Sequence, residues 1–233
     1  MQARRALVAL PFAVFGAAVF LYYLLLKAPL PPEEGTLRLH GLAAEVHIDS
    51  GELGIPRLFA ANASDVYRAL GFVTARDRLF QMDLLRRKPA GRLAEVFGAA
   101  ALKEDRWNRV MGFGRLADTI VSRLPAGQRN LLEAYAAGVN QAIRAAAMLP
   151  IEFTFLGYQP EPWRPKDSIL VMLAMDALLS WSGDQERAVT VMRQALPPSV
   201  VAFLTPESDC YDEKLSPLNS APRAPCRLPI SLP

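Results

Sequence analysis

Cysteine and histidine are scarce in this sequence of 233 residues. The two cysteines, Cys210 and Cys226, lie in a proline-rich stretch near the carboxyl end, without a second pair at metal-ligand spacing. The two histidines, His40 and His47, have no cluster of carboxylates beside them. These absences disfavour a zinc-type metal centre. A disulfide between the two cysteines and two separate thiols both remain open.

An excess of charge of one sign is also lacking, because the formal net charge is only +3. The best local cluster of positive charge is Arg86-Arg87-Lys88, and no aromatic side chains alternate with it. Nucleic-acid-binding surfaces usually combine a larger basic patch with a recognisable module. We therefore expect no nucleic-acid partner, and we interpret the cluster as a solvated or salt-bridged helix end.

One long apolar run stands near the amino end. Residues 6–26 carry no charge, and Arg4 and Arg5 precede them. As a helix, these residues would extend roughly 31 Å, which matches the hydrocarbon thickness of a bilayer. The run predicts a signal anchor or transmembrane helix over residues 1–27, followed by a proline-containing linker over 28–35. The membrane is thus an expected partner, with the bulk of the chain periplasmic or extracellular.

Beyond the linker the pattern is mostly helical. Alternating apolar residues predict strands at 36–39, 45–49 and 55–60, and Ser64 is a candidate N-cap of a long helix that ends near Gly91. Further helices are predicted around 93–97, 104–111, 116–124, 129–147, 168–182, 184–196 and just after Pro198. Residues 36–204 are thus mainly α with a few strands. Residues 205–233 contain six prolines and predict an extended tail.

The stretch from Gly54 to Gly98 is the most specific motif. It contains Gly-Ile-Pro, Ala-Asn-Ala-Ser-Asp, Gly-Phe-Val-x-Ala-x-Asp-Arg-Leu-x-Gln-Met, Arg-Arg and Gly-Arg-Leu-Ala-Glu in that order. This order resembles the amino-terminal part, or α chain, of the penicillin acylase family of N-terminal-nucleophile hydrolases. Arg57 and Arg76 depart from the family's usual His and Gln. The resemblance extends over about residues 36–205 and implies that the complete fold is an αββα sandwich.

A second motif, Gly-Tyr-Gln-Pro-Glu-Pro-Trp-Arg-Pro, ends at Pro165 and precedes the apolar run 168–182. In the resembled family a comparable segment precedes a helix beside the substrate pocket. Met175, Leu178 and Leu179 are therefore candidate pocket residues, and they predict an apolar acyl pocket. A buried core helix explains the same apolar run, and the two roles can coexist.

A catalytic residue is missing from this chain if the resemblance holds. Family members cut their own precursor before a serine, which then attacks the substrate while its α-amino group accepts the proton. No Gly-Ser pair occurs in the sequence. We therefore expect the catalytic serine on a following β chain of the same precursor, acting on a small-molecule amide: a β-lactam side chain, an acyl homoserine lactone or an acylated amino compound. The alternative is a truncated, non-catalytic, membrane-anchored helical binding or scaffold protein.

Two further expectations concern charged residues. By position, Glu186 matches a family glutamate that helps to bind calcium, so one calcium ion shared with the missing β chain is a candidate cofactor, and no organic cofactor is expected. A first-turn Glu that stabilises its helix dipole explains Glu186 equally simply. In the long helix, Asp77, Arg78 and the pair Arg86-Arg87 are expected to form buried or half-buried ion pairs.

Overall fold

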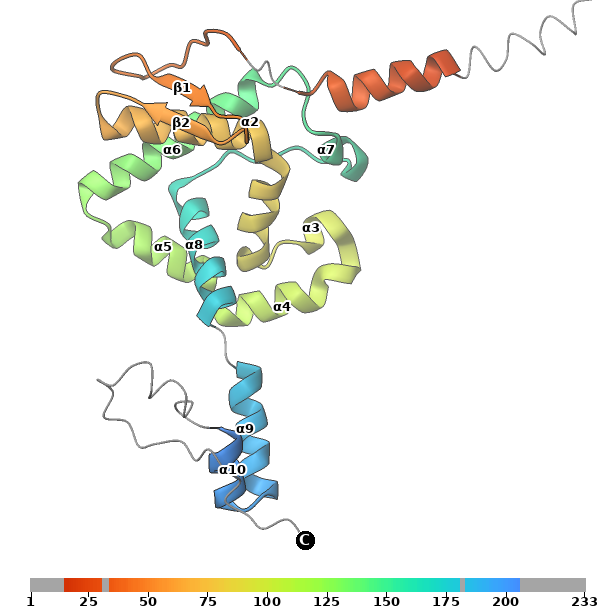
Figure 1. The fold of residues 1–233 in the computed structure, drawn as a ribbon, viewed down its shortest axis with the longest axis vertical. Coiled ribbons are helices and arrows are strands. Elements are labelled where there is room, and N and C mark those ends of the chain that lie inside the picture. Colours follow the sequence, from red (N-terminus) through yellow and green to blue (C-terminus); the bar gives the residue numbers. More distant parts are fainter. Residues whose placement is uncertain (1–14, 31–33, 181–182, 206–233) are drawn as a thin grey trace, which may run out of the picture. The chain divides into compact units, whose positions relative to one another are not determined.

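The computed structural model describes residues 15–30, 34–180 and 183–205, and these are mostly helical (Figure 1). The chain forms two compact units, which divide between Ala177 and Leu178. The elements are η1 (Tyr23–Lys27), β1 (His47–Ser50), β2 (Pro56–Phe59), α2 (Ala63–Ala90), α3 (Ala94–Phe97), η2 (Gly98–Ala101), α4 (Leu102–Met111), α5 (Phe113–Arg123), α6 (Ala126–Ala145), α7 (Ile151–Leu156), α8 (Pro165–Ser180), α9 (Gly183–Ala195) and α10 (Pro198–Leu204). The mainly helical class predicted from the sequence is confirmed.

The predicted membrane anchor needs correction. Within residues 15–30, 34–180 and 183–205, no helix is both long enough and apolar enough to cross a bilayer. The helix at the amino end covers residues 15–22 and continues as the short π-helix η1. Residues 6–14 of the predicted span lie outside the described residues. The expectation of a membrane-anchored protein is therefore contradicted, and the expected membrane partner is unconfirmed.

The sheet is a single antiparallel hairpin. Strand β1 pairs with β2 in the register His47 to Phe59 and Ser50 to Pro56. The strands predicted at 45–49 and 55–60 are thus present, whereas the strand predicted at 36–39 is absent. The reason lies in the backbone next to that segment: His40 N–H donates to Gln141 Oε1 at 2.7 Å, and His40 O accepts from Gln141 Nε2 at 2.9 Å. Helix α6, and no neighbouring strand, provides these partners.

Helix α2 begins two residues earlier than the candidate cap at Ser64 predicts. Asn62 is the N-cap, because its backbone is extended and its side-chain oxygen accepts from Asp65 N–H at 2.9 Å. The buried Asp65 carboxylate also accepts from the N–H groups of Ala43 and Ala44. The Ala43 hydrogen bond, together with that from Asn62, lowers the pKa of Asp65 against the opposing effect of burial. This carboxylate therefore attaches the preceding loop to the start of α2.

Helix α2 ends where the sequence predicts. Gly91 adopts the left-handed conformation at φ 65°, and its N–H donates to Arg87 O and Lys88 O. This is a common way for a helix to end, because glycine has no Cβ to oppose the left-handed backbone. The helix is kinked at Arg78, whose φ of −139° is not helical. The carboxyl half of α2, after the kink, carries the charged residues described below.

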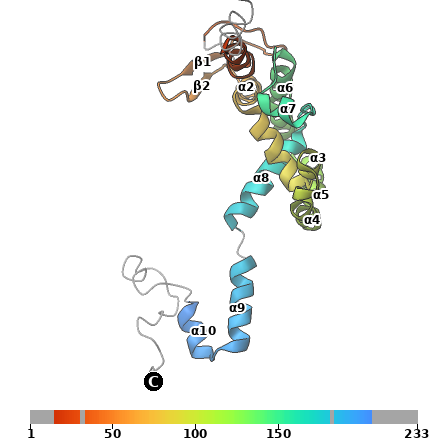
Figure 2. The same ribbon diagram turned by 90° about the vertical axis from the view of Figure 1, so that its right-hand side faces the viewer.

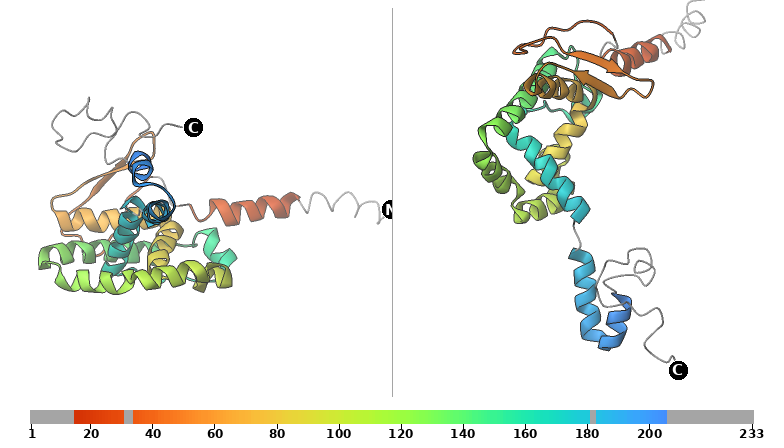
Figure 3. Two further views of the ribbon diagram at one scale, coloured as in Figure 1. Left: turned by 90° about the horizontal axis from the view of Figure 1, so that it is seen from below. Right: turned by 60° about the vertical axis from the view of Figure 1, so that its left-hand side comes forward.

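Helices α2 and α6 cross with their backbones in close contact, and Figures 2 and 3 show them side by side. A Cβ on Gly138 of α6 would lie 1.9 Å from Arg68 O, and one on Gly71 of α2 would lie 2.2 Å from Tyr135 O. Only glycine fits at either position.

The core of the first unit has two parts. One surrounds the α2–α6 crossing and is closed by Phe153 and Trp163 at its edge; the other joins α5 to α8. The larger part comprises Phe72, Val73, Ala75, Leu79, Met82, Ala136, Val139, Ala142, Phe153 and Trp163, and the smaller part Ala117, Ile169 and Leu170. The α2–α6 pair therefore positions the carboxyl half of α2 against α8.

Gly138→Ala tests this crossing. We expect it to lower the free energy of unfolding by about 3 kcal/mol, because the added methyl group meets a backbone carbonyl that cannot move independently. Chemical denaturation followed by circular dichroism measures the change. Gly127→Ala in the same helix is the control: nothing lies within 4 Å of its added Cβ, so its effect should stay within about 1 kcal/mol. Equal effects of the two substitutions would contradict the crossing geometry.

Candidate functional site

The most extensive cluster of charged, hydrogen-bonded side chains in the described residues surrounds Asp83, in the carboxyl half of α2. Its side chain is 1% exposed. One oxygen, Oδ1, accepts from Arg86 Nε at 3.0 Å and Nη2 at 2.6 Å. The other, Oδ2, accepts from Arg87 Nε at 2.7 Å and from the hydroxyl of Tyr158 at 2.9 Å. The spacings i+3 and i+4 place both arginines over the same carboxylate.

Arg86 connects α2 to the segment before α8. Its Nη2 donates to Glu161 O at 2.7 Å, and its Nη1 donates to Pro162 O at 3.1 Å and to Asp167 Oδ2 at 3.2 Å. The guanidinium carbon also lies 5.2 Å from the ring centre of Trp163. This buried cation is thus neutralised by two carboxylates and hydrogen-bonded on every nitrogen, the condition under which a buried charge is tolerated.

Arg87 and Arg92 form an outer layer with two glutamates. Glu95 accepts from Arg87 Nη1 at 2.7 Å and from Arg92 Nε at 2.8 Å, and Glu161 accepts from Arg92. Arg92 lowers the pKa of Glu161 to about 2 and also lowers that of Glu95. In return, the two glutamates raise the pKa of Arg92. All four side chains are therefore ionised across the neutral pH range.

The polar side-chain atoms of Tyr158 and Asp167 are also occupied by hydrogen bonds within the cluster. Burial, reinforced by the hydrogen bond to Asp83, raises the pKa of Tyr158, so its hydroxyl remains a donor. Asp167 is 2% exposed and accepts from Arg164 N–H at 2.8 Å, in the first turn of α8. Neither residue is available as a nucleophile or a general base, so the cluster holds structure together.

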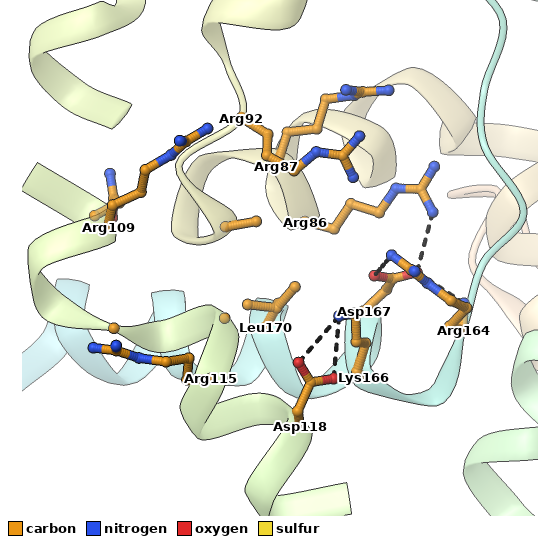
Figure 4. A pocket seen from close by; sticks show the side chains of 14 residues that line it. Arg86, Arg87, Arg92, Arg109, Arg115, Asp118, Arg164, Lys166, Asp167 and Leu170 are labelled. Atoms are coloured by element: carbon orange, nitrogen blue, oxygen red, sulfur yellow. Dashed lines mark hydrogen bonds and ion pairs between the residues drawn. The ribbon is translucent and has the colours of Figure 1, made fainter. Parts of the chain in front are cut away.

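A cleft of about 380 Å³ opens beside this cluster (Figure 4). Its walls come from the end of α2, from α4 and α5, and from the start of α8, with Leu170 between them. The lining contains seven cationic side chains and two carboxylates: Arg86, Arg87, Arg92, Arg109, Arg115, Arg164, Lys166, Asp118 and Asp167. No histidine, cysteine or serine lines the cleft. The cleft can therefore attract anions, but it has no obvious nucleophile.

The predicted pocket residues lie together on one side of α8. Met175 is 45% exposed, and Leu178 and Leu179 are 73% and 78% exposed. The opposite side of the same helix packs Ile169 and Leu170 into the core. One face of α8 is therefore buried in the core, as a core helix would be. The candidate pocket residues form a separate, exposed apolar surface. Their role in substrate binding stays a prediction.

Glu186 lies in the first turn of α9, and its side chain is exposed. Across residues 15–30, 34–180 and 183–205, no three His, Cys, Asp or Glu side chains converge to hold a metal ion. A role of Glu186 in binding calcium stays a prediction. Cys210 and Cys226 lie outside the described residues.

The expected ion pairs of α2 are present for only one half of the helix. Arg86 and Arg87 are buried and paired, whereas Asp77 and Arg78 are exposed; Asp77 contacts Arg76, and Arg78 donates to Gln81. The sequence reasoning missed the partners Asp83, Tyr158 and Asp167. Only Asp83 could have been found from the sequence, because Arg86 and Arg87 follow it at the i+3 and i+4 spacings of helix ion pairs.

The family model described as Penicillin amidase matches residues 43–220. A penicillin acylase 2 proenzyme of Pseudomonas sp. is 46% identical over 154 residues, which are 66% of this chain and 20% of that protein. The acyl-homoserine lactone acylase QuiP of Pseudomonas aeruginosa is 35% identical over 193 residues, 82% of this chain and 22% of that protein. The chain thus spans about a fifth of the length of these curated relatives.

A solved structure gives the same picture. A thermostable penicillin G acylase from Alcaligenes faecalis aligns with a TM-score of 0.60 and 26% sequence identity. The alignment covers 81% of this chain and 98% of the solved chain. Almost the whole of that solved chain therefore has a counterpart in this protein.

Asp83→Asn tests the charge cluster. Removing this carboxylate leaves Arg86 and Arg87 buried beside a neutral amide, so we expect a loss of about 3–5 kcal/mol in the free energy of unfolding. Chemical denaturation measures it. Asp49→Asn removes half of an exposed pair with Arg57 and should cost less than about 1 kcal/mol. A loss at Asp83 no greater than that at Asp49 would refute the structural role.

Proposed function

The chain belongs to the penicillin amidase family, and on that basis we propose that it is the amino-terminal part of an enzyme that hydrolyses linear amide bonds. The observation that carries the proposal is the family match over residues 43–220. Candidate substrates are a β-lactam side chain, an acyl homoserine lactone or an acylated amino compound. Penicillin acylases and acyl-homoserine lactone acylases are both among the similar proteins.

The nucleophile in this proposal is a serine at the amino terminus of a following β chain. Its hydroxyl adds to the amide carbonyl carbon while its own α-amino group accepts the hydroxyl proton. The same proton passes to the departing amine as the C–N bond breaks, and water then hydrolyses the acyl-enzyme. None of these atoms belongs to the described residues, whose charged cluster is fully engaged in structural bonds. The sequence likewise contains no Gly-Ser junction.

The exposed apolar surface of α8 is an argument for a partner chain. Met172, at 64% exposure, adds to the surface formed by Met175, Leu178 and Leu179. A helix that is apolar on nearly all sides is normally buried, and a contiguous exposed apolar patch marks an interaction surface. The curated relatives are about five times longer than the matched region. We propose that the rest of the precursor covers this surface.

Activity measurements separate the enzyme from a non-catalytic scaffold. Purified residues 28–233 should hydrolyse neither penicillin G nor an acyl homoserine lactone, whereas the complete protein should hydrolyse at least one of them. Mass spectrometry of the complete protein should find a second chain that begins with serine. Amide hydrolysis by residues 28–233 alone, or a gene that ends without a following β-chain region, would overturn the proposal.

The face formed by Met175, Leu178 and Leu179 is proposed to line an apolar acyl pocket. Leu178→Ala should lower kcat/KM for a substrate with an apolar acyl chain by about tenfold, since losing apolar contact of this size costs roughly 1–3 kcal/mol. Val110→Ala, at an equally exposed position on α4, should leave kcat/KM within about twofold. A strong preference of the complete enzyme for dicarboxylate acyl groups would argue against this pocket.

Calcium is proposed to bind at a site that Glu186 shares with the β chain. Calcium needs six to eight oxygen ligands, and this chain would contribute one carboxylate. Added calcium should raise the thermal midpoint of the complete protein, and Glu186→Gln should reduce that rise. Glu133→Gln, a change at an exposed glutamate of α6, should leave the rise intact. A calcium effect that is absent, or identical in all three proteins, would exclude this role.

A further inference from the structure

The cleft between α2, α4, α5 and α8 contains two cations that lie outside the network of ion pairs. Arg86, Arg87 and Arg92 are paired with the carboxylates described above, and Lys166 lies 3.1 Å from Asp118 Oδ1. Arg164 lies 3.6 Å from Asp167 Oδ1. By contrast, neither Arg109 nor Arg115 forms an ion pair with any described residue. The cleft therefore carries uncompensated positive charge.

Arg109 is also held in position. Its Nε donates to Gly91 O at 2.8 Å, at the carboxyl end of α2. This bond fixes the plane of the guanidinium, while none of the described residues accepts a hydrogen bond from its two terminal nitrogens. An arginine presents these donors as a rigid fork that matches an oxyanion with two acceptor oxygens. The bond to Gly91 thus already restrains part of the Arg109 side chain, which is otherwise exposed.

The amino end of α5 opens into the same cleft. Gly112 and Gly114 line the wall, and Gly112 is an N-cap without a side chain that could accept from the helix. The first turn of α5 contains no acidic residue. The first backbone N–H groups of an α-helix have no partner within the helix, and they favour a negative charge. A bound anion would satisfy them where a capping side chain is absent.

We propose that this cleft binds a small oxyanion, such as a phosphate or a carboxylate group, through Arg109, Arg115 and the amino end of α5. Figure 4 shows Arg109 and Arg115 across the cleft from Arg164. A concave site lined by charge of one sign attracts a counter-ion more strongly than isolated surface cations do. The volume of about 380 Å³ also leaves room for an organic group that carries the anion.

Titration calorimetry of the complete protein tests the proposal with inorganic phosphate at constant ionic strength, balanced with sodium chloride. We expect saturable phosphate binding that the double variant Arg109→Ala/Arg115→Ala weakens by at least about tenfold, the equivalent of one charge-assisted hydrogen bond. Arg106→Ala is the matched control, because Arg106 lies on α4 but does not line the cleft. This control should leave the dissociation constant within about twofold.

Gly114→Asp provides a second test that does not remove an arginine. Nothing lies within 4 Å of an added Cβ at this position, and an acidic residue in a first helical turn is favourable. The new carboxylate should occupy the site and abolish phosphate binding without lowering the thermal midpoint. The proposal is overturned if the wild-type protein shows no phosphate binding beyond the chloride control, if neither variant weakens it, or if carboxylate side chains of the remaining polypeptide already fill the cleft.

Discussion

The Asp83 carboxylate holds the carboxyl half of α2 in its place. It is buried, and four donors from Arg86, Arg87 and Tyr158 converge on its two oxygens. Arg86 then carries the connection to Asp167 at the start of α8. Buried charges of this kind are costly unless each is paired and hydrogen-bonded. The arrangement therefore fixes where α8 begins relative to α2, more specifically than apolar packing alone would.

The apolar core and the charge cluster hold different parts of the first unit together. The glycine contact between α2 and α6 sets how closely these two helices approach, and Phe153 and Trp163 close the larger part of the core. Trp163 also lies beside Arg86; its backbone carbonyl accepts from Asn140 Nδ2 of α6, and its N–H donates to Asn140 Oδ1. The segment before α8 is thus held by both systems. Its position determines which side of α8 remains outside the core.

Local sequence patterns predicted much of this fold. Gly91, for example, ends α2 as expected, because a helix end of this kind depends on one residue and its immediate neighbours. The strand expected at 36–39 failed for the opposite reason: a strand needs a partner, and the partner of His40 is Gln141, 101 residues away. The apolar run at the amino end has the composition of an anchor, yet no described helix can cross a membrane.

The candidate site could be predicted only in part. Arg86 and Arg87 were expected to be buried, but Asp167 and Tyr158 lie more than 70 residues from them, and no local pattern indicates such pairing. The basic cleft could not be predicted either, because its cations come from four helices and from the segments before α3 and α8. By contrast, the apolar face of α8 is visible as a run in the sequence, although which side of it faces the core depends on α5.

The central claim is that this chain is a framework whose apolar α8 surface is covered by the rest of a longer enzyme. Oxidation of Met172 and Met175 by hydroxyl radicals, measured by mass spectrometry, tests it directly, because both side chains are substantially exposed in this chain. The account predicts that both methionines are protected in the complete protein relative to residues 28–233 alone. Equal oxidation rates in the two samples would contradict it.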